Sequence, residues 1–275
     1  MRSRNEIQRD IAGIQEYCRR FAEGPPTPAP PVAVSPDVKR VSMLISMALD
    51  LRGQAATGKG LELGCGFGSL LFPMAEAMPE VRWTAIEHPG REYVSKPEYR
   101  AMFEKFKCEL VLSDIVRGPF PLPDEGFDVV TFSEVLEHLP VERLNPILRE
   151  IARVTKTGGI LLVSSPNLTS LENRIRLAKG KSILEMPDEV SYAAGTYGHI
   201  RLYTAGEIRK AMERLEFETL RCEIESCNAG YRGASERSLL RRGYRMYERL
   251  ERLLPALKRM GDTWYLAFVK RPAGE

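Results

Sequence analysis

Three glycines at alternate positions follow an apolar run that contains one acid. The acid is Glu62, within residues 61–63, and the glycines are Gly64, Gly66 and Gly68. Glycine adopts left-handed backbone conformations easily and allows a ligand to approach the main chain. A helix that follows such a loop points its first amides at the ligand. The pattern E-x-G-x-G-x-G, which differs from the G-x-G-x-x-G of dinucleotide sites, predicts a strand, a binding loop and a helix over residues 70–78.

The strands expected next also end in acids. Residues 81–86 form an apolar run that ends at Glu87, 19 positions after Gly68 (87 − 68). At this spacing, nucleotide-binding α/β folds place the acid that accepts hydrogen bonds from ribose hydroxyls. A third apolar run, residues 108–112, leads to Asp114 and Ile115. Further strands are predicted at 127–132, 160–163, 217–225 and 263–270, so the fold class is α/β.

The densest set of reactive side chains follows the strand predicted at 127–132. It consists of Ser133, Glu134, Glu137 and His138. Open α/β sheets bind ligands at the carboxyl ends of their strands, which is where this set would lie. The chain contains three histidines, and the other two are His88, next to Glu87, and His199, before a helix predicted at 205–215.

The glycine loop and its companion acids resemble class I S-adenosylmethionine (SAM) methyltransferases. The resemblance implies a Rossmann-like, seven-stranded mixed sheet with an antiparallel last strand. It implies that Glu62 and the loop hold the amino-acid end of SAM, that Glu87 binds the ribose, and that Asp114 and Ile115 contact the adenine. The cofactor set expected on this basis is Glu62, Gly64, Cys65, Gly66, Gly68, Glu87, His88, Asp114, Ile115 and Ser133.

The pattern E-x-x-E-H with a later histidine resembles the metal-ligand set of small-RNA 3′-end ribose 2′-O-methyltransferases. A similar E-x-x-E-H occurs in ubiquinone-pathway O-methyltransferases. The resemblance implies that Glu134, Glu137, His138 and His199 hold one divalent cation with two open positions, which would suit two neighbouring hydroxyls. Two imidazoles and two carboxylates favour Mn, Fe, Co, Ni or Zn, with Mg as an alternative.

A site without metal is equally consistent with these residues. The same E-V-L-E-H sequence occurs in small-molecule methyltransferases with no known metal, where Glu134 would contact SAM or cap a helix. His138 or His199 would then be the general base, since an imidazole titrates near neutrality. His88 would line the cofactor pocket or face solvent.

A second resemblance concerns the segment after the fifth strand. Ser165-Pro166-Asn167, residues 173–181 and Gly198-His199-Ile200-Arg201 are similar to methyltransferases of bacterial surface-glycan and sugar-modifying pathways. Residues 164–204 are too long for an ordinary connection, so we expect a substrate lid there. Residues 185–197 are longer and more polar than this family suggests.

Composition predicts a cytoplasmic globular protein. The 275 residues have a formal net charge of +3, which is too small to indicate nucleic acid binding by itself. The five cysteines lack the paired spacing of a metal site, and no apolar stretch is long enough to span a membrane. Residues 1–57 predict a helical cap with a Pro-rich linker at 24–36, and residues 58–275 predict the methyltransferase domain.

An Arg-rich insertion is expected at residues 229–261. Apolar residues at helical spacing with interleaved arginines are typical of a helix packed on its own domain. A homodimer contact, a membrane-surface patch and a site for phosphate-bearing substrates are the alternatives.

These patterns predict SAM-dependent methyl transfer to oxygen of a small polyhydroxylated acceptor, such as a sugar or a catechol-like ring. RNA ribose 2′-O-methylation is the main alternative. C- or N-methylation of a metabolite and a SAM-binding protein without turnover are two others.

Overall fold

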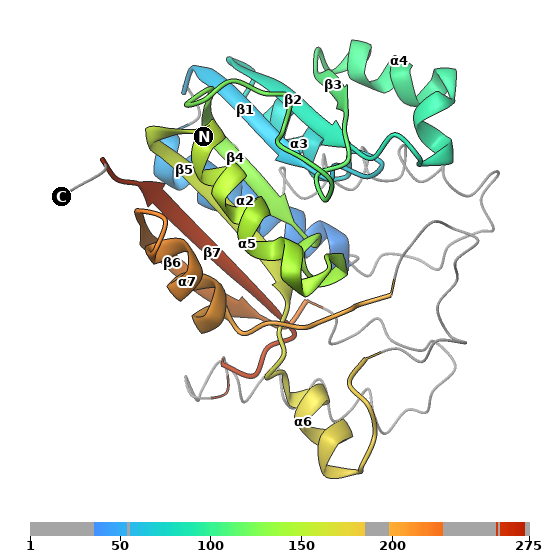
Figure 1. The fold of residues 1–275 in the computed structure, drawn as a ribbon, viewed down its shortest axis with the longest axis vertical. Coiled ribbons are helices and arrows are strands. Elements are labelled where there is room, and N and C mark those ends of the chain that lie inside the picture. The colour runs from blue at the N-terminus through green and yellow to red at the C-terminus, as the bar shows by residue number, and fades with distance from the viewer. Residues whose placement is uncertain (1–35, 54–55, 185–197, 228–256, 258, 273–275) are drawn as a thin grey trace.

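Seven strands form one twisted sheet at the centre of the molecule (Figure 1). The computed structural model describes residues 36–53, 56–184, 198–227, 257 and 259–272. The strands are β1 (Gly58–Leu63), β2 (Val81–Glu87), β3 (Glu109–Leu112), β4 (Phe127–Ser133), β5 (Thr155–Pro166), β6 (Phe217–Glu225) and β7 (Thr263–Lys270). Their spatial order is β3-β2-β1-β4-β5-β7-β6.

The first five strands run parallel, and β7 lies antiparallel between β5 and β6. This confirms the predicted seven-stranded mixed sheet with an antiparallel last strand. The strand order reverses direction between β1 and β4, which are parallel neighbours. Such a switch point opens a crevice at the carboxyl ends of the strands, where α/β folds bind their ligands.

Helices cover each face of the sheet, and one helix, Leu171–Ala178, lies outside these two layers (Figure 1). The helices are α2 (Pro36–Arg52), α3 (Leu71–Ala77), α4 (Pro97–Lys105), α5 (Val141–Val154), α6 (Leu171–Ala178) and α7 (Ala205–Glu213), with the 3₁₀ turns η1 (Glu92–Ser95) and η2 (Leu136–His138). Successive strand residues point to opposite faces. Accordingly, Val129 and Leu162 pack with α2, α3 and α4, whereas Val130 and Leu161 pack with α5 and α7.

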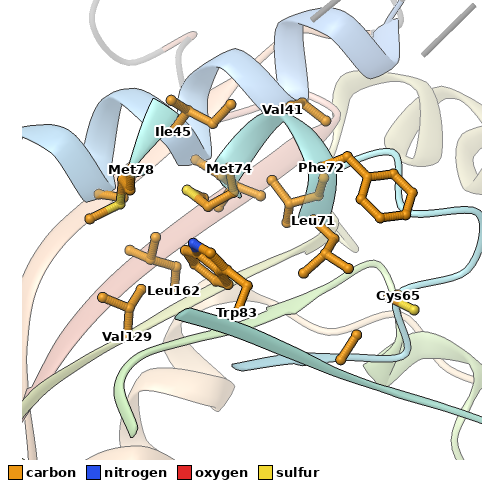
Figure 2. Close-up of a cluster of buried hydrophobic side chains, with 14 of the residues drawn as sticks. Val41, Ile45, Cys65, Leu71, Phe72, Met74, Met78, Trp83, Val129 and Leu162 are labelled. Carbon is orange, nitrogen blue, oxygen red and sulfur yellow. The ribbon is translucent and has the colours of Figure 1, made fainter. Parts of the chain in front are cut away.

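Helix α2 contributes buried side chains to the hydrophobic core. Its residues Leu44 and Ile45 are fully buried, and they lie in the same apolar cluster as Met74 of α3 and Trp83 of β2. Figure 2 shows side chains of α2 and α3 meeting the sheet at Trp83, Val129 and Leu162. Because α2 leads directly into β1, this packing fixes the start of the sheet.

The structure differs from the sequence analysis in the number of helices and in the bounds of one strand. Helices α4 and α5 were not identified from the sequence, and β5 begins at Thr155 rather than at residue 160. The expected lid includes the end of β5 and α6, and its residues 185–197 lie outside the described part of the chain. Residues 1–35 of the N-terminal region and most of the Arg-rich insertion, 228–256 and 258, also lie outside the described part of the chain.

Among the described residues, none of the helices is long and apolar enough to cross a membrane.

Candidate functional site

A cavity of about 400 Å³ lies at the carboxyl ends of the parallel strands, within the size range of small-molecule sites. The structure brings nine of the ten predicted cofactor residues to its wall. They are Glu62, Gly64, Cys65, Gly66, Glu87, His88, Asp114, Ile115 and Ser133. Glu134 and His138 also line the cavity, whereas Gly68 does not.

The three loop glycines have positive φ angles, of 70°, 54° and 77° for Gly64, Gly66 and Gly68. Their surroundings differ. A Cβ on Gly68 would overlap the ring of Phe72, so this glycine serves the packing of α3. A Cβ on Gly66 would meet no atom within 4 Å, and Gly66 lines the cavity. Only Gly66 therefore leaves room that a ligand could fill.

The glycine loop is held by residues of other elements. The amide of Gly66 donates to Glu87 Oε2 (2.6 Å), and the amide of His88 donates to Glu87 Oε1 (2.8 Å). Tyr99 of α4 donates from its hydroxyl to the carbonyl of Gly66 (2.7 Å) and lies 3.4 Å from Cys65 Sγ. Burial, and next the charge of Glu87, raise the pKa of the Cys65 thiol, so Cys65 acts as a packed neutral group.

Glu62 is a buried carboxyl group at the cavity wall. It is 4% exposed, and its Oε2 is buried without a hydrogen-bond partner among the described residues. Burial, and next the charge of Glu87, raise the pKa of this carboxyl well above its usual value. Buried polar atoms are nearly always hydrogen-bonded, so this oxygen at a cavity wall fits the amino group of a ligand such as SAM.

The cavity wall also contains Glu87, His88 and Asp114. Asp114 Oδ1 accepts from the amide of Val116 (2.9 Å), and Asp114 Oδ2 lies 3.5 Å from His88 Nε2. Ile115 adds an apolar side chain to the wall. This set suits a nucleoside, because it combines hydrogen-bond acceptors with an apolar surface.

The wall residues that sequence reasoning missed include Arg40, Arg91 and Tyr93. The ring of Tyr93 lies against that of Phe67, with 4.3 Å between centroids. Arg40 reaches the cavity from α2. These residues belong to segments without a local motif, so no pattern in the sequence marks them.

Glu134 is paired with Arg40 rather than with the histidines. Arg40 Nη1 lies 3.1 Å from Glu134 Oε2, and Ser164 Oγ donates to Glu134 Oε1 (2.9 Å). Ser133 joins the same chain of contacts through a 2.8 Å hydrogen bond to Ser164. Glu134 has a φ of 55°, a left-handed conformation that is strained for a residue other than glycine.

Glu137, His138 and His199 form a separate cluster. Each offers one ligand atom, and these atoms lie within 4.8 Å of one another. The two imidazole rings are 5.0 Å apart, and the amide of Ile200 donates to the carbonyl of Glu137 (2.8 Å), which ties the segment carrying His199 to η2. The structure thus groups three of the four predicted metal ligands, and Glu134 lies outside the group.

Glu137 is the buried member of this cluster, with 1% of its surface exposed. Its Oε2 accepts from Ser165 Oγ (3.0 Å), whereas its Oε1 has no hydrogen-bond partner among the described residues and lies 3.9 Å from His138 Nε2. Burial, and next the charge of Glu134, raise the pKa of Glu137 to about 8. An unsatisfied oxygen beside two imidazoles could take a cation or orient a protonated imidazole.

Comparison with known proteins identifies a family whose fold is the one described above. The model of a family described as methyltransferase domain matches residues 38–221, which is more than half of the chain. The chain belongs to this methyltransferase family. Its sheet order is that of a class I SAM-dependent methyltransferase.

Two curated relatives have different acceptors. A tRNA N(3)-cytidine methyltransferase METTL2 from Danio rerio is 25% identical over 175 residues, or 61% of this chain and 47% of the relative. A ubiquinone biosynthesis O-methyltransferase from Aliivibrio fischeri is 27% identical over 156 residues, or 57% of this chain and 62% of that protein. The chain spans about half the length of the METTL2 proteins that it matches.

Solved structures share the fold at lower identity. Magnesium protoporphyrin IX methyltransferase from Synechocystis, solved with bound S-adenosylhomocysteine (SAH), has a TM-score of 0.57 and 15% identity. The match covers 94% of each chain. A SAM-dependent methyltransferase from Archaeoglobus fulgidus has a TM-score of 0.55 and 19% identity, and the match covers 85% of this chain and 94% of that one.

Proposed function

We propose that this methyltransferase transfers the methyl group of SAM to a hydroxyl oxygen of a small polyhydroxylated acceptor, such as a sugar or a catechol-like ring. The observation that carries the proposal is the position of His138. It lines the cofactor cavity and also belongs to the cluster with Glu137 and His199. A hydroxyl bound beside this imidazole would face the cofactor.

The residues of the cavity would hold SAM by both ends. Glu62 would accept hydrogen bonds from the amino group, Glu87 from the ribose hydroxyls and Asp114 from the adenine amino group. SAM carries a good leaving group, so the protein must chiefly align it with a deprotonated nucleophile. In the transfer, the acceptor oxygen forms a bond to the methyl carbon while the bond from that carbon to sulfur breaks, and SAH leaves.

The hydroxyl proton requires an acceptor, and His138 and His199 are the candidates. An imidazole nitrogen can act as the general base that accepts this proton. Glu137 would orient the imidazole through its Oε1, which has no hydrogen-bond partner among the described residues. His138 is the better placed of the two, because it alone lines the cofactor cavity as well.

A divalent cation is a compatible addition to this site. Glu137, His138 and His199 would supply one oxygen and two nitrogens, a donor set that suits Mn, Fe, Co, Ni or Zn better than Mg. When bound, the cation would lower the pKa of the acceptor hydroxyl. Glu134, in its contact with Arg40 and Ser164, would not be a ligand.

A substrate screen read out as SAH release tests the function. Monosaccharides and catechols are offered with SAM, with and without chelator and added metal. We expect turnover with one of these classes, and loss of at least about 100-fold in kcat for His138→Ala. Glu137→Gln should strongly reduce kcat and the content of any bound metal. Glu134→Gln is the matched control and should reduce neither strongly. Turnover confined to amines or carbon acids would contradict the proposal.

RNA methylation is a second candidate, because several of the matched relatives are named as tRNA N(3)-cytidine methyltransferases. It predicts tRNA binding that weakens steeply with salt, since phosphate contacts release counterions. Incubation with tRNA and labelled SAM, followed by nucleoside analysis, distinguishes the two. Label in RNA but in no small acceptor would favour this second function.

A further inference from the structure

Helix α6 exposes apolar surface. Six large apolar side chains are exposed among the described residues, and two of them, Ile175 and Leu177, lie on this one short helix. They are 45% and 58% exposed, and Leu177 is the most exposed of the six. A helix in a globular domain usually turns such side chains towards the core.

The same helix and the residues just after it carry a local excess of positive charge. Residues 171–181 contain four cations, Arg174, Arg176, Lys179 and Lys181, and one acid, Glu172, which leaves a net charge of +3 (4 − 1). Arg174 Nε and Arg176 Nε donate to the carbonyl oxygens of Thr169 (2.9 Å) and Ser182 (2.7 Å). A carbonyl oxygen orients a guanidinium but does not neutralise its charge.

The helix is firmly attached at its first turn. The side chain of Ser170 accepts from the amide of Asn173, and Asn173 Nδ2 donates to the carbonyls of Asn167 (3.0 Å) and Leu168 (3.1 Å). Asn173 is the buried residue of α6. The fold therefore fixes the orientation of α6, with Asn173 on its buried side and with Arg174, Ile175 and Leu177 exposed.

The position of α6 places this exposed face near the catalytic edge. Figure 1 shows α6 beyond the carboxyl end of β5, outside the two helical layers that cover the sheet. The cofactor cavity and the cluster with His199 lie at the same edge. A surface that binds α6 would thus lie at the same edge of the sheet as the cavity (Figure 1).

We propose that α6 docks this enzyme onto an anionic lipid surface. Basic side chains with exposed aliphatic residues are the combination that binds at the boundary between headgroups and acyl chains. Surfaces that bind single-stranded RNA combine cations with aromatic side chains on which the bases stack. The exposed apolar residues of α6 are aliphatic, so the pattern favours lipid. This inference is independent of the identity of the methyl acceptor.

Vesicle co-sedimentation of the full chain tests the docking. Vesicles of phosphatidylglycerol mixed equally with phosphatidylcholine are compared with pure phosphatidylcholine, at low and at high salt. We expect binding to the mixed vesicles only, weakened by salt. Removing an exposed cation lowers the partition coefficient about fivefold. The triple variant Arg174→Gln/Lys179→Gln/Lys181→Gln should therefore lose about 100-fold.

Variants of the exposed apolar residues test whether α6 inserts into the lipid surface or is only attracted to it by charge. Ile175→Ser/Leu177→Ser should reduce the partition coefficient roughly tenfold or more. Leu220→Ser is the matched control, because Leu220 is 42% exposed but lies on β6. SAM affinity, measured by calorimetry, should be the same in all of these variants as in the parent. Unchanged affinity would show that the variants are folded.

Three results would overturn the proposal. One is equal sedimentation of the parent chain with anionic and neutral vesicles. Another is unchanged vesicle binding in the apolar double variant. The third is tRNA binding that the cation variant loses, together with no vesicle binding by the parent chain, which would make α6 an RNA contact.

Discussion

The amide of Gly66 lies 2.6 Å from the Glu87 carboxylate and donates a hydrogen bond to it. This contact joins the glycine loop after β1 to the end of β2, and both residues line the cavity. Glu87 also accepts from the amide of His88, so two backbone donors set the direction of its carboxylate. The loop and the expected ribose acid are therefore one preorganised unit.

The first prediction concerns the open space at Gly66. Gly66→Val should abolish SAM binding, because the new side chain would enter the cavity wall. The substitution also costs about 1–2 kcal/mol of stability, since valine is strained at a φ of 54°. Gly158→Val is the matched control, because Gly158 has a φ of 77° and equally open space but lies outside the cavity wall. Calorimetric titration with SAM should show binding lost in the first variant only, and normal binding in Gly66→Val would contradict the role of the loop.

The second prediction uses the raised pKa of Glu62. The folded, cofactor-free protein holds a proton on Glu62 that the unfolded chain releases at a lower pH. This contribution to stability is therefore present at acid pH and is lost as the pH rises through the folded-state pKa. Glu62→Gln cannot ionise, so its melting temperature should fall less than that of the parent between about pH 5 and about pH 8. Differential scanning calorimetry at both pH values measures the difference, with the exposed Glu76→Gln as control.

The same variant should bind SAM poorly. Removal of a charged acceptor from the ammonium group of SAM costs about 1.5–3 kcal/mol, or roughly tenfold to 100-fold in Kd. In the parent, binding favours the ionised carboxylate and should release a proton, so SAM affinity should increase from about pH 5 towards neutrality. Proton release is measured by calorimetry in two buffers of different ionisation enthalpy. A pH-independent Kd in the parent would show that Glu62 does not meet the ammonium group.

A third prediction follows from the ion pair between Arg40 and Glu134. Arg40 supplies positive charge to the cavity wall, which suits the carboxylate of SAM, and Arg40→Gln should raise the Kd for SAM about tenfold. Arg221→Gln is the control, because it removes another ion pair of α2, with Asp50, and neither residue of this exposed pair lines the cavity. That exposed pair should contribute less than about 1 kcal/mol to stability. Equal SAM affinity in the two variants would exclude Arg40 from the cofactor site.

The sequence predicted those parts of the site that depend on chain-local patterns. Glu62, Gly66, Glu87 and Asp114 each follow or lie within a strand with clear apolar periodicity, so their shared edge could be inferred from the rules of parallel sheets. Arg40 and Tyr99 lie on helices and reach the cavity or loop only through tertiary packing. The pairing of Glu134 with Arg40 was missed for the same reason, because it joins residues 94 positions apart (134 − 40). Apolar periodicity indicates which face of a helix or strand is buried. It does not indicate which side chain from a distant part of the sequence contacts that face.

The last prediction concerns the contribution of α2 to the domain. Leu44 is fully buried between α2 and the sheet, whereas Lys39 on the same helix is exposed. Leu44→Ala should lower the free energy of unfolding by about 2–5 kcal/mol, because it removes apolar contacts and leaves a cavity. Lys39→Ala should change it by less than about 0.5 kcal/mol. Urea unfolding followed by tryptophan fluorescence is suitable, because Trp83 and Trp264 are both buried in the core. A single transition that shifts as a whole would show that α2 unfolds with the sheet, whereas an unshifted main transition would show that α2 is an independent cap.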